Sequence, residues 1–147
     1  MKKSIDRVGV LLVFAVMAVL AIVGCNRADM NGELDGNWQL LEWRDNASGN
    51  IVADNSSYLF YTVKLEMIQF HYKKSSARPY QAYFSYTGDS LFLGQAYMNQ
   101  ANSDSAVSIS VLHPYGVDAH GTFRVCELNS RRLVLQNTEN TLVFRKY

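Results

Sequence analysis

The amino-acid sequence predicts an all-β protein in which eight antiparallel strands close into an up-and-down barrel. From about residue 36 onward, apolar and polar residues alternate with a period of two, and turn-forming residues separate the runs. The 147-residue chain contains nine Tyr, seven Phe and two Trp, and this aromatic content favours strands. No connection offers the helical crossover that parallel strands need, so sequential neighbours are expected to pair antiparallel. Eight such strands can close on themselves and leave no unpaired edge.

Eight segments are predicted as strands, in chain order. They are residues 37–43, 61–72, 80–87, 90–95, 106–112, 121–128, 132–136 and 141–146. Gly88-Asp89 is expected to form the tight turn between the third and fourth strands. Asn129-Ser130 and residues 137–140 separate the last three strands in the same way. Pro79 and Pro114 lie at strand borders, where a missing amide hydrogen disturbs no ladder.

The second of these strands has a competing interpretation. Leu59, Val63, Met67 and Phe70 also have the spacing of one face of a helix. The alternation of apolar and polar residues changes phase at Ile68, as a bulge in a long bent strand would cause. We prefer the bent strand, and a helix over residues 59–70 is the open alternative.

The first 24 residues have the features of an export signal. Basic residues between Lys2 and Arg7 precede an uncharged apolar run from Val8 to Val23. These 16 residues are fewer than the roughly 20 that a membrane-spanning helix needs. Ile22-Val23-Gly24-Cys25 resembles the lipobox of bacterial lipoproteins, which implies cleavage before Cys25 and attachment of lipid to its thiol. An uncleaved signal anchor is the alternative.

This resemblance implies a lipoprotein of the cell envelope, held in the outer membrane by palmitate-type acyl chains. Two or three acyl chains attach a protein stably, whereas a single chain binds reversibly. Residues 25–35 are polar and are expected to form a flexible tether between the lipid and a barrel domain of residues 36–147. Whether the domain faces the periplasm or the cell surface stays open.

The charge of the chain argues against a nucleic-acid partner. Removal of residues 1–24 would leave 11 basic and 12 acidic residues from the 14 and 13 of the whole chain. The basic doublets Lys73-Lys74 and Arg131-Arg132 each fall at a predicted turn, where we expect solvated side chains. No cluster of Lys and Arg is predicted that could follow a phosphate backbone.

The candidate nucleophiles and metal ligands predict a non-enzyme without a cofactor. The three histidines are dispersed and have no metal-ligand spacing, and no serine lies in a nucleophile elbow. Cys126 has no partner once Cys25 is acylated, and we expect it to lie in the core as a small hydrophobic residue. The sequence therefore predicts neither catalytic residues nor a metal site.

Several motifs together resemble one protein family. Gly36-Asn37-Trp38, which opens the first strand, resembles the G-x-W signature of the lipocalins. Over about residues 34–147, the chain resembles the lipocalin-like domain of small lipoproteins from Gram-negative gut bacteria. The stretches that carry this resemblance are Thr87–Leu91, Leu112–Gly116, Leu133–Leu135 and Leu142–Tyr147. The resemblance implies a calycin-type barrel in which Trp38 closes one end and Arg145 lies across its ring as a cation–π partner.

The end of the chain resembles a second motif of the same group. Arg145-Lys146-Tyr147 is similar to the R-x-Y pair with which fatty-acid-binding proteins hold a carboxylate inside the barrel. Alternation places Leu142 and Phe144 on one face and Arg145 and Tyr147 on the other. We expect the apolar pair to face the interior and Arg145 to lie outside or at the rim.

Two functions follow from this fold. The first is binding of a small, largely apolar molecule inside the barrel, with Tyr61, Tyr83, Phe84 and Phe92 as lining residues. The second is a filled barrel that acts as a non-enzymatic interaction or inhibitor module. It would bind another envelope protein through the polar connections 44–57 and 99–105. An open interior of roughly 300 Å³ or more would favour the first, and a filled core with exposed apolar residues the second.

Overall fold

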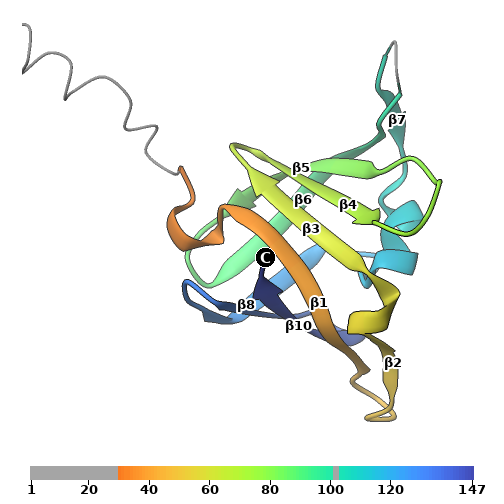
Figure 1. Ribbon diagram of the computed structural model, residues 1–147. Coiled ribbons are helices and arrows are strands. Elements are labelled where there is room, and N and C mark those ends of the chain that lie inside the picture. The colour runs from red at the N-terminus through yellow and green to blue at the C-terminus, as the bar shows by residue number, and fades with distance from the viewer. Residues whose placement is uncertain (1–29, 101–102) are drawn as a thin grey trace, which may run out of the picture.

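The computed structural model describes residues 30–100 and 103–147, which form a closed antiparallel barrel (Figure 1). The ring of eight strands runs β1-β3-β4-β5-β6-β8-β9-β10, and β10 pairs with β1 to close it. All of these pairings are antiparallel. The predicted eight-stranded up-and-down barrel is confirmed. The predicted signal peptide of residues 1–24 and the lipid attachment site Cys25 lie outside the described residues.

The elements of the described part of the chain are ten strands and three short 3₁₀ helices. They are η1 (Gly32–Leu34), β1 (Gly36–Asp45), β2 (Ile51–Asp54), η2 (Asn55–Ser57), β3 (Leu59–Lys64), β4 (Met67–Tyr72), β5 (Tyr80–Tyr86), β6 (Ser90–Met98), β7 (Ser105–Val107), η3 (Ile109–Tyr115), β8 (Thr122–Leu128), β9 (Arg132–Gln136) and β10 (Asn140–Lys146).

The segment of residues 61–72 is two strands and not one long bent strand or a helix. β3 ends at Lys64, the chain turns at Leu65-Glu66, and β4 pairs back antiparallel from Met67. Leu65 has a φ of 57°, a left-handed conformation that glycine normally supplies in so short a turn. The change of phase at Ile68 therefore marks a hairpin and not a bulge.

The predicted strand over residues 106–112 is also wrong in large part. Only β7 is extended there, and it pairs with β6 outside the ring. Ser108 then caps the start of η3, and Gly116, with a φ of 89°, caps its end. The ring still has eight strands, because the predicted strand 61–72 is two strands, β3 and β4, and the predicted strand 106–112 lies outside the ring.

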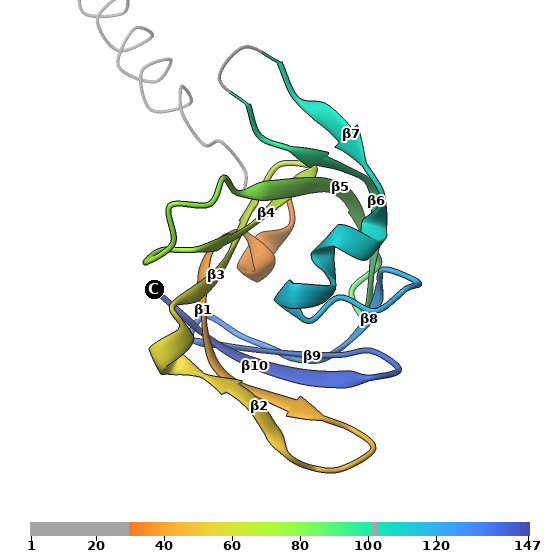
Figure 2. The same cartoon turned by 90° about the vertical axis from the view of Figure 1, so that its right-hand side faces the viewer.

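β2 was not predicted and extends the barrel wall at one edge. It lies within the polar connection 44–57, and it pairs only with β1 among the described strands. Ile51 and Val52 lie on this edge strand with 58% and 53% of their surfaces exposed. The β1–β2 hairpin projects beyond the ring in Figure 2.

Alternate side chains of the ring strands form one core, with η1 and η3 at its two ends. Figure 2 shows η3 lying inside the ring of strands. Leu112 of η3 and Leu34 of η1 are fully buried. Residues 32–34 had been assigned to the flexible tether, but η1 belongs to the folded domain. The largest fully buried side chains are Trp38, Tyr61, Phe60, Phe70, Phe123, Phe144, Leu34, Leu40, Leu59, Ile68, Leu91 and Leu112.

Candidate functional site

Aromatic side chains from opposite walls meet in the barrel interior. Tyr61 of β3 lies with its ring centroid 4.7 Å from that of Phe70 and 4.7 Å from that of Phe144. Its hydroxyl donates a hydrogen bond to the carbonyl oxygen of Tyr115 in η3, 2.5 Å away. Burial raises the pKa of Tyr61 well above its usual range, and the neighbouring Tyr72 adds to this effect, so the hydroxyl stays a donor. These contacts tie the barrel wall to η3 through its interior.

Two of the four predicted lining residues lie outside the barrel. Tyr61 is fully buried and Phe84 packs against the core, but Tyr83 and Phe92 are 47% and 42% exposed. Alternation explains this, because Ala82 and Leu91 are fully buried and their strand neighbours must point to the opposite face. Of the four residues predicted to line the interior, Tyr61 and Phe84 point inward, and Tyr83 and Phe92 point outward.

Trp38 is buried near η1, but its cationic neighbour is Lys146 and not Arg145. The indole Nε1 donates to the carbonyl oxygen of Leu34 at 2.8 Å, and the Lys146 Nζ lies 5.0 Å from the ring centroid. Strand register decides the pairing, because β10 places Lys146 opposite Trp38 and Arg145 opposite Gln39. Leu142 and Phe144 are fully buried, as alternation predicted.

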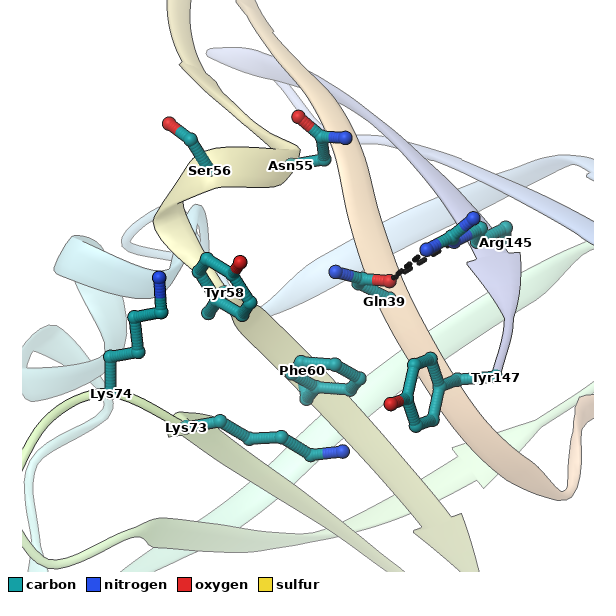
Figure 3. A pocket seen from close by; sticks show the side chains of 9 residues that line it. All are labelled: Gln39, Asn55, Ser56, Tyr58, Phe60, Lys73, Lys74, Arg145 and Tyr147. Carbon is teal, nitrogen blue, oxygen red and sulfur yellow. Dashed lines mark hydrogen bonds between the residues drawn. The ribbon is translucent and has the colours of Figure 1, made fainter.

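The candidate site is a cavity of about 570 Å³ on the outer face of the barrel wall (Figure 3). Its residues come from β1, η2, β3, β10 and the segments that follow η2, β4 and β10. They are Gln39, Asn55, Ser56, Tyr58, Phe60, Lys73, Lys74, Arg145 and Tyr147. None of the four predicted ligand-lining residues is among them.

Aromatic rings and lysine ammonium groups form one side of this outer cavity. Phe60 is buried although it faces away from the barrel interior, because Tyr147 meets it edge-on at 5.2 Å. The Lys73 Nζ lies 3.8 Å from the centroid of Phe60 and 4.1 Å from that of Tyr147. The Lys74 Nζ lies 3.7 Å from the centroid of Tyr58. Cation–π attraction therefore holds both ammonium groups against the rings.

Arg145 forms the opposite side of the cavity. Its Nε and Nη2 donate to Oε1 of Gln39 at 3.0 and 2.7 Å, so a neutral amide fixes the guanidinium. Figure 3 shows Phe60 near the centre, with Lys73 extending toward Tyr147 and with Lys74 and Arg145 on opposite sides. Within residues 30–100 and 103–147, none of these three cations belongs to an ion pair.

The backbone around the cavity is held by specific hydrogen bonds. The backbone amide of Lys73 donates to the carbonyl oxygen of Tyr58 at 3.0 Å. The backbone amide of Tyr147 donates to the carbonyl oxygen of Asn37 at 2.8 Å. Tyr58 itself has a φ of 54°, a strained conformation for a bulky residue. The fold therefore maintains a strained aromatic residue beside Lys74.

His71 lies next to this group on β4. Its ring stacks on Phe60 with centroids 5.7 Å apart. Burial lowers the pKa of His71, and the positive charge of Lys73 lowers it further. The imidazole is therefore held in its neutral form beside the lysine.

A second cavity of about 640 Å³ lies over β8, β9 and the turn before β10. Its one described acidic lining residue, Asp118, is engaged in hydrogen bonds that hold the surrounding loops. Asp118 accepts from the hydroxyl of Thr138 at 2.7 Å and from the amides of His120 and Gly121. Burial opposes ionisation of this carboxyl, but these hydrogen bonds and that from the Thr138 amide lower its pKa overall. Asp118 therefore organises the loop around η3.

Other candidate groups lie apart from both cavities. Cys126 is exposed and not in the core, because Phe123 and Val125 face the core and alternation along β8 points Cys126 outward. Among the described residues, no three His, Cys, Asp or Glu side chains come close enough to hold a metal ion. Within those residues no helix has the length and apolar character to span a bilayer.

Part of the outer cavity had a signal in the sequence. Alternation placed Arg145 and Tyr147 together on the outer face, whereas Lys73-Lys74 was interpreted as solvated turn residues. Gln39 and Phe60 gave no signal, because neither the pairing of β1 with β10 nor the β3–β4 hairpin is visible locally. The cavity assembles only when these strands are neighbours.

Comparison with known proteins supports the fold. A family model described as a lipocalin-like domain matches residues 18–147. A solved lipocalin-like protein from Bacteroides uniformis is 20% identical, with a TM-score of 0.56, over 79% of this chain and 100% of that one. A solved uncharacterized protein from Bacteroides eggerthii is 23% identical, with a TM-score of 0.51, over 77% of this chain and 98% of that one. No curated protein matches this chain.

Proposed function

This chain belongs to the family of lipocalin-like domains, and from that premise we propose that it is a lipid-anchored envelope protein that binds a small amphipathic molecule. The binding site is the outer cavity and not the barrel interior. One observation carries this proposal: aromatic rings and polar groups that can still form hydrogen bonds line the same cavity of about 570 Å³. Sites for small molecules combine apolar walls with a few orienting polar groups in this way.

The packing of the barrel favours the outer position. The interior positions of β1, β3, β4, β8 and β10 carry bulky residues that are at most 1% exposed, namely Trp38, Tyr61, Phe70, Phe123 and Phe144. η3 lies against them at one end and η1 at the other. A ligand entering the interior would have to displace packed side chains, whereas the outer cavity is open to solvent.

Binding is tested with the full chain in phosphatidylcholine nanodiscs. Naphthalene-2-carboxylate and its neutral isostere naphthalene-2-carboxamide are titrated by calorimetry. Tyr147→Ala removes one ring of the cavity from a side chain that is 69% exposed, so the fold should be unaffected. We expect affinity for both probes to fall by about two- to tenfold, the usual value of one aromatic contact.

Tyr83→Ala is the matched control, because Tyr83 is also an exposed tyrosine but lies on β5 outside this cavity. It should leave both affinities unchanged. Equal effects of the two substitutions, or no binding of either probe to the unaltered protein, would refute the proposed site.

The lipid anchor is tested separately. We expect the chain expressed in a Gram-negative host to incorporate an alkyne-labelled palmitate and to fractionate with the outer membrane. Cys25→Ser should abolish the label. Labelling that persists in Cys25→Ser would show that Cys25 is not the attachment site.

A binding module for another envelope protein is the second candidate function. The exposed Ile51 and Val52 on the edge strand β2 favour it, since an unpaired edge can accept a strand from a partner. A photo-crosslinking residue placed at Val52 should capture one defined protein in the host envelope. The same residue at Leu65, which is exposed on the β3–β4 turn, is the control and should capture none.

A further inference from the structure

We infer that the outer cavity selects an organic anion whose charged group binds Lys73 and Arg145 and whose flat apolar body lies against the exposed ring of Tyr147. This inference rests on the proposed function and names the class of ligand that the site takes. Its physical basis is a set of positive charges that the fold positions with neutral groups.

The cations of this cavity have no acidic side chain beside them. Lys73, Lys74 and Arg145 contribute three positive charges, and no Asp or Glu is among the described residues that line the cavity. The nearest acidic residue along the chain, Asp54, is charged, but its carboxylate accepts hydrogen bonds from the amide and hydroxyl of Ser56 at 2.9 and 2.6 Å and forms no ion pair with these cations. Three like charges in one cavity repel each other, and a bound anion would relieve that repulsion.

Neutral groups hold these cations in place. Elsewhere in the described residues, Arg44 and Arg132 pair with glutamates at 2.6 and 3.0 Å. Lys73 instead lies between two rings, and Arg145 is held by the amide of Gln39. Neutral partners orient a cation without cancelling its charge, so both groups keep the capacity for a charge-assisted hydrogen bond.

Tyr147 offers a surface for the apolar part of the ligand. Its ring is 69% exposed and lies beside the Lys73 ammonium group, and the buried Phe60 supports it edge-on. A flat apolar body can stack there while its anionic group replaces water around Lys73. A cavity of about 570 Å³ is large enough for a ligand with two fused rings.

The test compares the two naphthalene probes on the full chain in phosphatidylcholine nanodiscs. They have the same shape and differ in charge, so we expect the carboxylate to bind about tenfold tighter than the carboxamide. Lys73→Gln and Arg145→Gln should each reduce this preference several-fold. Carboxamide affinity should change by less than about twofold, and Lys73→Arg should restore the preference.

Lys64→Gln is the control for loss of one positive charge, because Lys64 is exposed on β3 and does not line the cavity. It should leave the preference unchanged. Equal binding of the two probes, with Tyr147→Ala still weakening both, would overturn this inference and leave the proposed function standing. Failure of both probes to bind would overturn both. A preference that survives Lys73→Gln and Arg145→Gln would overturn the roles of these residues.

Discussion

The hydrogen bond between Tyr61 and η3 gives the sharpest test of how the barrel is closed. Tyr61→Phe removes only the hydroxyl, so the packing of the ring against Phe70 and Phe144 is retained. The carbonyl oxygen of Tyr115 then loses its buried donor. Leaving such a group unpaired costs about 1–3 kcal/mol of unfolding free energy. For a domain of this size, the melting temperature should fall by about 3–5 °C for each kcal/mol.

Tyr72→Phe provides the matched comparison. The Tyr72 hydroxyl donates to the adjacent carbonyl, that of Pro114, at 2.6 Å, but it lies at the solvent-accessible rim. Water can replace that donor, so we expect a loss of about 0.5–1 kcal/mol. The unfolding free energy of both variants can be measured by urea titration, with the fluorescence of the buried Trp38 and Trp43 as the signal. Equal losses for the two substitutions would contradict the buried position of the Tyr61 bond.

Three further predictions concern single residues. Leu65→Gly should raise the unfolding free energy by about 0.5–1 kcal/mol in urea unfolding, since glycine adopts the φ of 57° without strain. A loss of stability would contradict this. Because the pKa of His71 is lowered in the folded state, the unfolded chain binds more protons. The unfolding free energy should therefore decline as the pH falls below about 6.5, and His71→Phe should flatten this part of the profile; an unchanged profile would refute the assignment. Cys126 is exposed, so the folded protein should react with a thiol reagent as fast as the urea-unfolded chain; strong protection in the folded protein would show that Cys126 is buried.

Alternation was a good guide to which side of the barrel wall a residue faces. It placed Leu142 and Phe144 inside and Arg145 outside, and the structure agrees. It also excluded Tyr83 from the interior once its neighbour Ala82 was known to face inward. It was less reliable after Cys126, where a bulge between Val125 and Glu127 shifts the phase so that Leu128 faces the core, because the extra residue has no signature in the sequence.

Turn chemistry explains the errors in strand boundaries. The hairpin between β3 and β4 turns at Leu65-Glu66, and neither residue is typical of a turn, so the two strands were interpreted as one. Tertiary pairing of β3 with β1 and of β4 with β5 stabilises this turn despite the left-handed Leu65. The η3 helix was likewise hidden by an apolar run that could equally be a strand.

The sequence alone therefore determined the class of fold, because a period of two and the lack of helical crossovers are local properties of antiparallel sheets. The tertiary structure decided the candidate site. Gln39 and Arg145 are 106 residues apart in the chain and become partners only because β10 closes the ring against β1. Lys73 reaches Tyr147 for the same reason. A cavity built from strand register and ring closure has no local pattern, since each of its charges looks like an ordinary solvated residue until the sheet brings them together.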